Sequence, residues 1–215
     1  MTHERRFDPA KLSKLDAPER RARMPPSAVA AALELGPNAR VADVGAGSGY
    51  VTFALLAADP SPALVHALDV STGMLEELAR RAATHPRGST IRTQLAPAEA
   101  LPLDAASVDR VVLGNVFHEL DDAPRALAEA RRVLAPGGRI VIFDWERPDG
   151  ASGPADIGPP YEHRVAQRAV EAALRSAGFE DVRSHDGFRD VYALSARAVG
   201  HVMSATARHP SFPTL

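Results

Sequence analysis

The sequence predicts a doubly wound α/β domain, in which a mostly parallel sheet of seven strands carries helices on both faces. Near-continuous apolar runs alternate with helix-like segments along the chain, which is the pattern of strands buried on both faces of a parallel sheet. A second observation is the glycine-rich turn 45–49, which stands between the first apolar run and the helix after it. The length of 215 residues fits one domain.

The expected elements follow one another from residue 25 onward. Ser27 follows two prolines and is expected to cap a helix that stops at Gly36. The run 39–45 is short, apolar and ended by glycines, which indicates a strand, and the alternation continues to Trp145. The segment 146–163 is rich in Gly, Pro and Asp and is expected to be a loop. We expect helices at 28–35, 50–59, 72–85, 123–138 and 165–179, and strands at 39–45, 64–70, 89–96, 109–116, 139–145, 181–185 and 191–199.

The chain is expected to have three parts. They are a basic N-terminal arm over residues 1–24, one domain over residues 25–200 and a C-terminal tail over residues 201–215. In the arm, isolated apolar residues such as Phe7 and Leu12 stand among charged ones, which suits a lid over an active site. A solvated leading segment has the same composition, so both interpretations stay open.

Composition and charge exclude several classes of protein. The chain has no cysteine, which excludes disulfides, thiolate nucleophiles, thiolate zinc sites and thiolate-dependent methylation. Its 25 Lys and Arg against 27 Asp and Glu leave no field for holding a nucleic-acid backbone. The N-terminus has no apolar signal region, and no run approaches the roughly 20 apolar residues that span a bilayer. The histidine spacing indicates no metal site. We therefore expect a cytoplasmic monomer or homodimer without a nucleic-acid or membrane partner.

The turn after the first expected strand carries the strongest functional signal. Its glycines have the spacing G-x-G-x-G, with Asp43 two residues ahead of the first and Tyr50 after the last. A dinucleotide loop has the spacing G-x-G-x-x-G, and a carboxylate at Asp43 would repel a pyrophosphate but suit a cationic amino group. No Gly-Lys-Ser/Thr follows, which excludes a phosphate loop of that kind. Asp69 ends the next expected strand, where a carboxylate can accept hydrogen bonds from both hydroxyls of a ribose.

Four segments in order along the chain carry further motifs. They are VADVGAGSGY, LVHALDVS, LPLDAASVDRVVLGNVFHEL and ARRVLAPGGRIVIFDW. Together they resemble class I S-adenosylmethionine-dependent methyltransferases, and most nearly the small-molecule enzymes similar to those of quinone biosynthesis, often called type 11. The resemblance extends from residue 25 to residue 145. It implies a Rossmann-like fold, S-adenosylmethionine as the cofactor and methyl transfer to a small-molecule acceptor.

The resemblance also implies which residues hold the cofactor. Asp43 would hold the amino group of its methionine end, and Asp69 would accept from the ribose hydroxyls. The family usually has D-A-E before L-P, where this chain has Pro97-Ala98-Glu99, so the adenine contact falls to the backbone of Ala98 or to Glu99. The other implied cofactor residues are Gly45, Ala46, Gly47 and Gly49 of the turn, Val70 and Met74 beside the adenine, and Asn115 and Val116 at the methionine end.

Methyl transfer from a sulfonium depends mainly on an in-line approach and on the exclusion of water. A base is needed only for an acceptor that must lose a proton. His118 follows the fourth expected strand and His163 ends the loop after the fifth, so both are candidate bases. The alternative for His118 is packing within its loop, and for His163 it is a place at the start of a helix. Asp144 is a further candidate for lining the pocket, and Tyr50 is a candidate either for lining the pocket or for contacting the carboxylate of the cofactor.

Other functions stay open on the sequence. An NAD-linked oxidoreductase would use a similar sheet, but the glycine spacing and Tyr50 disfavour it. A regulatory or assembly protein that binds the cofactor without transferring its methyl group has the same motifs. The segment Gly158-Pro159-Pro160-Tyr161 resembles the Asn/Asp-Pro-Pro-Tyr/Phe segment of amino-methylating nucleic-acid enzymes, but it begins with glycine and follows the fifth strand rather than the fourth.

Overall fold

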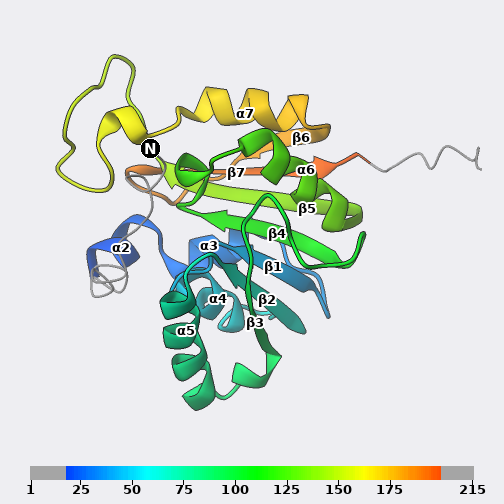
Figure 1. Cartoon of the computed structure of the whole chain (residues 1–215). Coiled ribbons are helices and arrows are strands. Elements are labelled where there is room, and N and C mark those ends of the chain that lie inside the picture. The colour runs from blue at the N-terminus through cyan, green and yellow to red at the C-terminus, as the bar shows by residue number, and fades with distance from the viewer. Residues whose placement is uncertain (1–17, 200–215) are drawn as a thin grey trace, which may run out of the picture.

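One sheet of seven strands lies at the centre of residues 18–199, which are the residues that this computed structural model describes. Residues 1–17 of the expected arm and the expected tail 201–215 lie outside the described residues. The strands are β1 (Arg40–Val44), β2 (Leu64–Asp69), β3 (Ile91–Leu95), β4 (Val108–Gly114), β5 (Leu134–Trp145), β6 (Phe179–Ser184) and β7 (Val191–Ala198). Their spatial order is β3-β2-β1-β4-β5-β7-β6 (Figure 1).

The sheet is parallel from β3 to β5 and antiparallel at its other edge. Each neighbouring pair among β3, β2, β1, β4 and β5 is parallel, whereas β7 runs antiparallel to both β5 and β6. The chain leaves β1 towards β2 and β3 and then returns to β4 on the other side of β1, so the strand order reverses between β1 and β4. Ligands of doubly wound sheets bind outside the carboxyl ends of the strands at such a switch point. The predicted mostly parallel sheet of seven strands is therefore confirmed.

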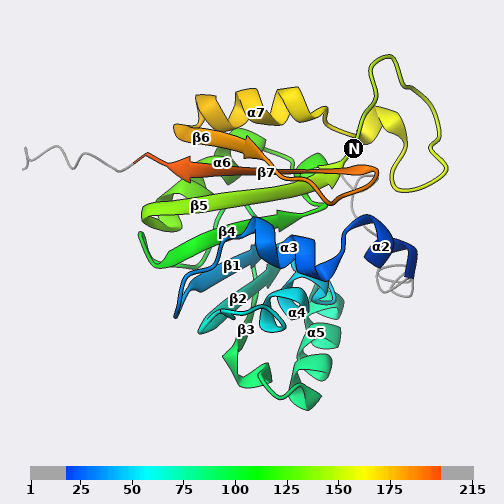
Figure 2. The ribbon, with the colours of Figure 1, turned by 180° about the vertical axis from the view of Figure 1, so that it is seen from behind.

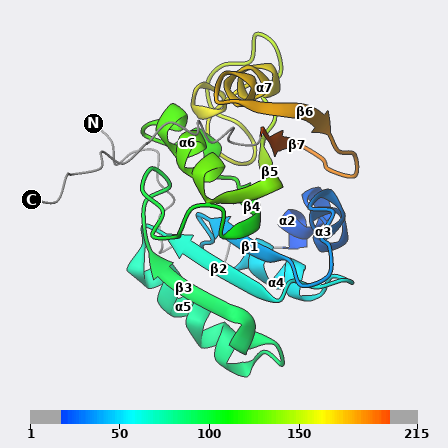
Figure 3. The same ribbon diagram turned by 90° about the vertical axis from the view of Figure 1, so that its right-hand side faces the viewer.

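Helices cover both faces of the sheet (Figures 1 and 2). The described α-helices are α2 (Pro18–Arg23), α3 (Pro26–Ala32), α4 (Tyr50–Leu56), α5 (Thr72–Thr84), α6 (Ala123–Val133) and α7 (Gln167–Ser176), and the described 3-10 helices are η2 (Gly88–Thr90), η3 (Phe117–Glu119) and η4 (Tyr161–His163). Val29 and Leu55 of α3 and α4 and Leu78 of α5 belong to the core on one face. Leu127 of α6 and Leu174 of α7 belong to the core on the other, and Figure 3 shows α3 and α6 on opposite sides of the strands. None of the helices between residues 18 and 199 is long and apolar enough to cross a membrane.

The start of α3 differs from the prediction. Pro25 occupies the N-cap position with φ −58° and ψ 134°, and no side chain caps the helix. The predicted cap by Ser27 is therefore wrong, since Ser27 already lies inside the first turn. Pro26 begins the helix because its fixed φ suits the first helical position, where its missing N–H has no intrahelical partner to lose.

Four helices end at least three residues earlier than the sequence predicts, α3 at Ala32, α4 at Leu56, α6 at Val133 and α7 at Ser176, and the structure shows the cause for α3 and α6. α3 ends at Ala32, where the guanidinium of Arg110 donates to the carbonyl oxygens of the next two residues at 2.6 Å each. α6 ends at Val133, and Leu134 already pairs with Val108 as the first residue of β5. In both cases a partner that is distant in sequence takes up the chain at the helix end. Helix propensity depends on neighbouring residues in the sequence, so it cannot predict an end that is set by such a distant partner.

Candidate active site

The glycine-rich turn after β1 is bound to the end of β2. The N–H groups of Gly45 and Ala46 donate to the carbonyl oxygen of Leu68 at 2.7 and 2.9 Å. The N–H of Gly47 donates to Oδ2 of Asp69 at 2.8 Å. These hydrogen bonds hold the predicted glycine turn against the predicted acid Asp69 at the end of β2.

Two glycines of this turn are required by close packing. Gly45 has a φ of +72°, and a Cβ at this position would collide with the side chain of Val116. Gly49 has a φ of +97° at the N-cap of α4, and a Cβ there would lie 2.7 Å from the ring of Phe53. The turn is therefore in contact with the segment after β4, and Val116 lies against Gly45.

Asp43 is a buried carboxylate near the carboxyl end of β1, and only 1% of its surface is exposed. Its Oδ2 accepts a hydrogen bond from Oγ1 of Thr52 at 2.6 Å, whereas its Oδ1 has no hydrogen-bond partner among the described residues. Burial raises the pKa of Asp43 to about 6, although the hydrogen bond from Thr52 acts in the opposite direction. The nearby charge of Asp69 also raises this pKa. A buried carboxylate with an unused oxygen destabilises the fold and suits a cationic group of a ligand.

Two more buried oxygens near this turn have no hydrogen-bond partner within residues 18–199, Oδ1 of Asn115 and Oγ of Ser48. Asn115 directly follows β4 with a φ of +61°, and its N–H donates to the carbonyl oxygen of Phe143 at 2.7 Å. Asp43 and Asn115 thus lie at the carboxyl ends of β1 and β4, the two strands that flank the switch point. An ammonium group has three N–H donors and needs acceptors of this kind. The chemistry of these side chains fits the amino group of a methionine moiety.

Asp69 ends β2 and is 9% exposed. Besides the bond from Gly47, its carboxylate accepts the N–H of Ser71 at 2.8 Å through Oδ1. Burial raises the pKa of Asp69, and hydrogen bonds from the backbone N–H groups of Ser71, Gly47 and Val70 act in the opposite direction. Each carboxylate oxygen can accept a further hydrogen bond, so the pair suits the two hydroxyls of a ribose.

The residues expected beside an adenine ring differ in exposure. Val70 is 46% exposed and presents an apolar surface beyond the end of β2, whereas Met74 in the first turn of α5 is buried. Glu99 directs its carboxylate to the turn before α6, where Oε1 accepts the N–H of Asp122 at 3.4 Å. Of the two adenine contacts that the resemblance implies, this arrangement favours the backbone of Ala98.

His118 is bound to Asp144 by two hydrogen bonds. The backbone N–H of His118 donates to Oδ2 at 2.9 Å, and the ring Nδ1 lies 2.7 Å from Oδ1. Asp144 is fully buried near the end of β5 and also accepts the N–H of Trp145 at 2.7 Å. Because an ionised carboxylate only accepts, Nδ1 carries a proton and Nε2 of the neutral ring is an acceptor. Two predicted candidates are thus one hydrogen-bonded pair.

The charges around His118 favour its protonated form. Burial lowers the pKa of His118, but the charge of Asp144, the hydrogen bond to it and the charge of Glu119 together raise the pKa above its ordinary value. Oε1 of Glu119 lies 3.6 Å from Nε2. Arg164 acts in the opposite direction. The raised pKa makes the neutral ring a stronger base, because its surroundings stabilise the imidazolium that forms when it takes up a proton.

The loop between β5 and α7 is organised around Arg164, which is 4% exposed. Its guanidinium donates to the carbonyl oxygens of Glu146, Ile157 and Pro159 and lies over the rings of Trp145 and Tyr161. His163 is the last residue of η4 and directly precedes Arg164. It is half-buried, and its N–H donates to the carbonyl oxygen of Pro160 at 3.0 Å. The charge of Arg164 acts on His118, so this loop reaches the same corner of the site. Arg164 was not predicted, because nothing in the sequence separates it from the other arginines.

Tyr50 connects the glycine turn to α2. It is 8% exposed, and its hydroxyl donates to the carbonyl oxygen of Met24 at 2.6 Å. The single hydroxyl proton is therefore directed to the end of α2. This contact holds the described part of the expected arm against the first turn of α4.

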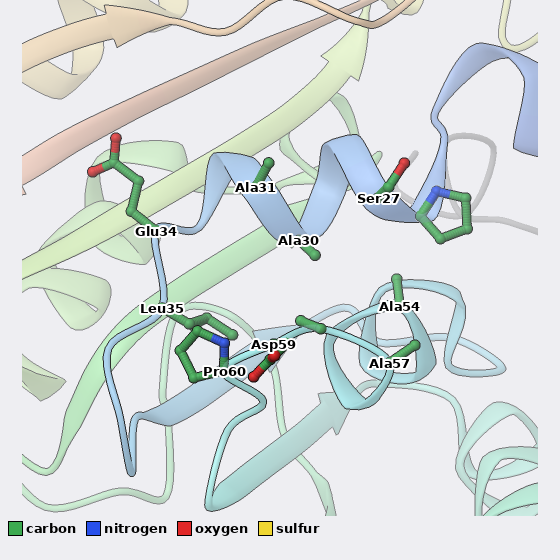
Figure 4. A pocket seen from close by; sticks show the side chains of 11 residues that line it. Ser27, Ala30, Ala31, Glu34, Leu35, Ala54, Ala57, Asp59 and Pro60 are labelled. Atoms are coloured by element: carbon green, nitrogen blue, oxygen red, sulfur yellow. The ribbon is translucent and has the colours of Figure 1, made fainter.

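A cavity of about 510 Å³ lies between α3 and α4 (Figure 4). Its lining consists of Pro26, Ser27, Ala30, Ala31, Glu34, Leu35, Ala54, Ala57, Ala58, Asp59 and Pro60. No predicted cofactor or catalytic residue is among them. The cavity therefore lies apart from the glycine turn and its acids.

A glycine turn joined to an acid of the neighbouring strand, with unused acceptors at a switch point, is an arrangement whose chemistry suits a nucleoside that carries an amino-acid group. Residues 42–142 match a family model described as a methyltransferase domain. This match, together with the relatives described below, indicates that the chain is similar to class I S-adenosylmethionine-dependent methyltransferases, whose cofactor is S-adenosylmethionine.

Relatives with known names agree with this family. The chain is 32% identical over 116 residues to the ubiquinone/menaquinone biosynthesis C-methyltransferase UbiE of Geotalea daltonii, covering 54% of this chain and 49% of that protein. It is 34% identical over 162 residues to the malonyl-[acyl-carrier protein] O-methyltransferase of Methylococcus capsulatus, covering 68% and 54%. The chain therefore spans about half the length of these curated relatives. A solved S-adenosylmethionine-dependent methyltransferase from Aquifex aeolicus superposes with a TM-score of 0.79 and 26% identity, covering 90% of this chain and 100% of that chain.

Proposed function

We propose that this protein transfers a methyl group from S-adenosylmethionine to a small-molecule acceptor. The observation that carries the proposal is the pair of unused buried acceptors at the switch point, Oδ1 of Asp43 and Oδ1 of Asn115, beside the carboxylate of Asp69. Buried acceptors are rarely left unpaired in a fold, so these two suit a bound ammonium group. The carboxylate suits ribose hydroxyls. S-adenosylmethionine carries both groups on one molecule, and the family match supports this choice.

The cofactor would be held along the carboxyl ends of β1, β2 and β4. Asp43 and Asn115 would bind the ammonium group, the backbone of residues 45–47 would lie along the methionine and the ribose, and Asp69 would bind the ribose hydroxyls. Val70, Met74 and the backbone of Ala98 would contact the adenine. When bound, the cofactor supplies a methyl group on a positively charged sulfur, whose departure as a neutral thioether requires no proton. The chain itself must align the acceptor and exclude water.

His118 is proposed as the base for an acceptor that loses a proton. Asp144 holds the Nδ1 proton at 2.7 Å, so the neutral ring keeps a lone pair on Nε2 that can receive the proton of the acceptor. The imidazolium that results is stabilised by the charges of Asp144 and Glu119, which raise the pKa of His118 more than burial lowers it. His163 is proposed only as a residue of the acceptor pocket wall, through its position beside Arg164.

A small acceptor is proposed because the near balance of 25 basic and 27 acidic residues provides no surface field for a nucleic acid. The names of the relatives indicate which reactions to test first. They are carbon methylation in quinone biosynthesis and oxygen methylation of malonyl-[acyl-carrier protein]. We also expect a cytoplasmic protein that is a monomer or a homodimer.

Calorimetry and a transfer assay test the proposal in sequence. Titration with S-adenosylhomocysteine should give a saturable isotherm, and titration with NAD should give none. Radiolabelled S-adenosylmethionine should then label a product in an extract of small metabolites. Binding of NAD without binding of the sulfur nucleoside would overturn the proposal. Cofactor binding without any labelled product would instead favour a regulatory protein.

A further inference from the structure

α2 lies at the side of the sheet to which the arrows of β4 and β5 point (Figures 1 and 2), beside the glycine turn. Three contacts fix its end. Tyr50 donates from its hydroxyl to the carbonyl oxygen of Met24 at 2.6 Å, and the N–H of Arg189 donates to the carbonyl oxygen of Arg23 at 2.9 Å. Nε of Arg23 donates to Oδ2 of Asp190 at 3.1 Å. Residues near the end of α2 therefore have a defined position relative to the site.

Arg20 is carried by this helix to the first turn of α4. Its guanidinium carbon lies 4.2 Å from the centroid of the Tyr50 ring, a geometry in which the cation is attracted by the aromatic face. The backbone of Arg20 is fixed as well, because its carbonyl oxygen accepts the N–H of Met24 at 2.8 Å. Tyr50 directly follows Gly49, so the guanidinium lies beside the end of the glycine turn.

The charges at this place have opposite signs. Asp43 and Asp69 provide negative charge on the strand side of the turn, and Arg20 provides positive charge on the helix side. The field of Arg20 reaches Asp43 and is among the causes that act to lower the pKa of that carboxyl. A ligand that matches both signs is a zwitterion, with its ammonium group at the acids and its carboxylate at the guanidinium. The two acids would repel a carboxylate placed near them.

We propose that Arg20 binds the carboxylate of the methionine end of S-adenosylmethionine. This inference rests on the proposed function, because it assigns a further residue to the same cofactor. Tyr50 supports the contact through its ring, over which the guanidinium lies, while its hydroxyl is bound to Met24. The described end of the N-terminal arm thus becomes part of the cofactor site, and the cofactor is recognised at both the ammonium group and the carboxylate of its methionine end.

Decarboxylated S-adenosylmethionine tests this assignment, because it keeps the ammonium group, the sulfonium and the nucleoside and lacks only the carboxylate. Calorimetry should show that Arg20→Gln weakens binding of S-adenosylmethionine by about 10- to 100-fold, the loss expected for a charged hydrogen-bonded contact. The same variant should bind the decarboxylated compound as the wild-type protein does, within about threefold. Arg20→Lys should retain part of the affinity for S-adenosylmethionine.

Arg21→Gln is the matched control, since Arg21 lies on the same helix and is exposed. It should bind both compounds with wild-type affinity, and thermal unfolding should show that all three variants are folded. Equal weakening of both compounds by Arg20→Gln, or no weakening of either, would overturn the inference while leaving the proposed function intact. Failure of the wild-type protein to bind S-adenosylmethionine would overturn the proposed function, and this inference with it.

Discussion

Two regions at the carboxyl edge of the sheet differ in how completely their buried polar groups are paired. The cofactor side is the region around the glycine turn, and the acceptor side is the region around His118 and the loop between β5 and α7. On the cofactor side, Asp43 and Asn115 each keep a buried oxygen without a hydrogen-bond partner in the described chain. On the acceptor side, Asp144 is as deeply buried, yet its carboxylate accepts the backbone N–H groups of His118 and Trp145 and pairs with the His118 ring. Arg164 nearby is likewise bound to several carbonyl oxygens.

This contrast distinguishes buried polar groups that stabilise the fold from buried polar groups that suit contact with a ligand. A buried polar atom that serves only the fold is paired, because an unpaired one costs about 1–3 kcal/mol. Burial of a carboxylate therefore does not by itself mark a ligand contact. The unused oxygen of Asp43 indicates a ligand contact. The carboxylate of Asp144 has its hydrogen-bond partners within the chain, which indicates that it positions His118.

Asp144→Asn should have the largest effect, a loss of about 2–4 kcal/mol in the free energy of unfolding at pH 6. The variant leaves His118 buried without its counter-charge. Because the folded-state pKa of His118 is raised above 6.5, its stabilisation is fully present below pH 6.5 and is lost as pH rises through the folded value. The loss should therefore be smaller at pH 9 than at pH 6, as measured by urea denaturation.

Asp149→Asn is the control for this measurement. Asp149 pairs with Arg168 at 3.0 Å, but both side chains are largely exposed, at 81% and 78%. Its effect should stay below about 0.5 kcal/mol at both pH values. A similar loss in both variants, or no pH dependence for Asp144→Asn, would contradict the distinction between paired buried groups and surface pairs.

Asp69→Ala should weaken binding of S-adenosylhomocysteine by about 10- to 100-fold, because two charge-assisted hydrogen bonds to the ribose are lost with partial replacement by water. The glycine turn should also loosen, since Gly47 donates to this carboxylate. Calorimetry measures the change, with the exposed Asp104→Ala as a control that should bind normally. A folded Asp69→Ala protein with wild-type affinity would remove Asp69 from the site.

Asp43→Asn should have a smaller effect on stability than Asp144→Asn and one of the opposite sign, a gain of about 1–2 kcal/mol at pH 8. The folded-state pKa of about 6 exceeds the ordinary 3.8, so the folded protein binds the extra proton between these values and its stability falls as pH rises from 3.8 to 6. The gain of the variant should therefore be full above pH 6 and vanish below pH 3.8. The same variant should bind S-adenosylhomocysteine about tenfold more weakly.

Thermal unfolding over this pH range, combined with calorimetry, measures both changes of Asp43→Asn. A gain in stability together with a loss in affinity would sharpen the contrast between the two sides of the edge. A loss of stability at pH 8 would show that Asp43 belongs with Asp144 among the groups that support the fold.

The sequence predicted the fold, and it predicted the proximity of the residues proposed to hold the cofactor better than that of the residues proposed to act on the acceptor. The glycine turn and the acids Asp43 and Asp69 lie within one β-turn-α-β unit, so their spacing along the chain is close to their arrangement in space. His118 and Asp144 were separate candidates, because they come from segments 26 residues apart that meet only when β4 pairs with β5. Local patterns also misplaced the cap at Ser27.

The sequence by itself determined the order of strands and helices, the place of the glycine turn and the acids at the ends of β1 and β2. These features follow from the spacing of apolar residues and from glycines at a turn, both of which act over a few residues. Only the tertiary structure decided which polar atoms are paired and which are left over. It joined His118 to Asp144, set Arg20 over Tyr50 and left Oδ1 of Asp43 without a partner among the described residues. The physical reason is that hydrogen bonds and charges act through space, and their partners become neighbours only when the sheet forms.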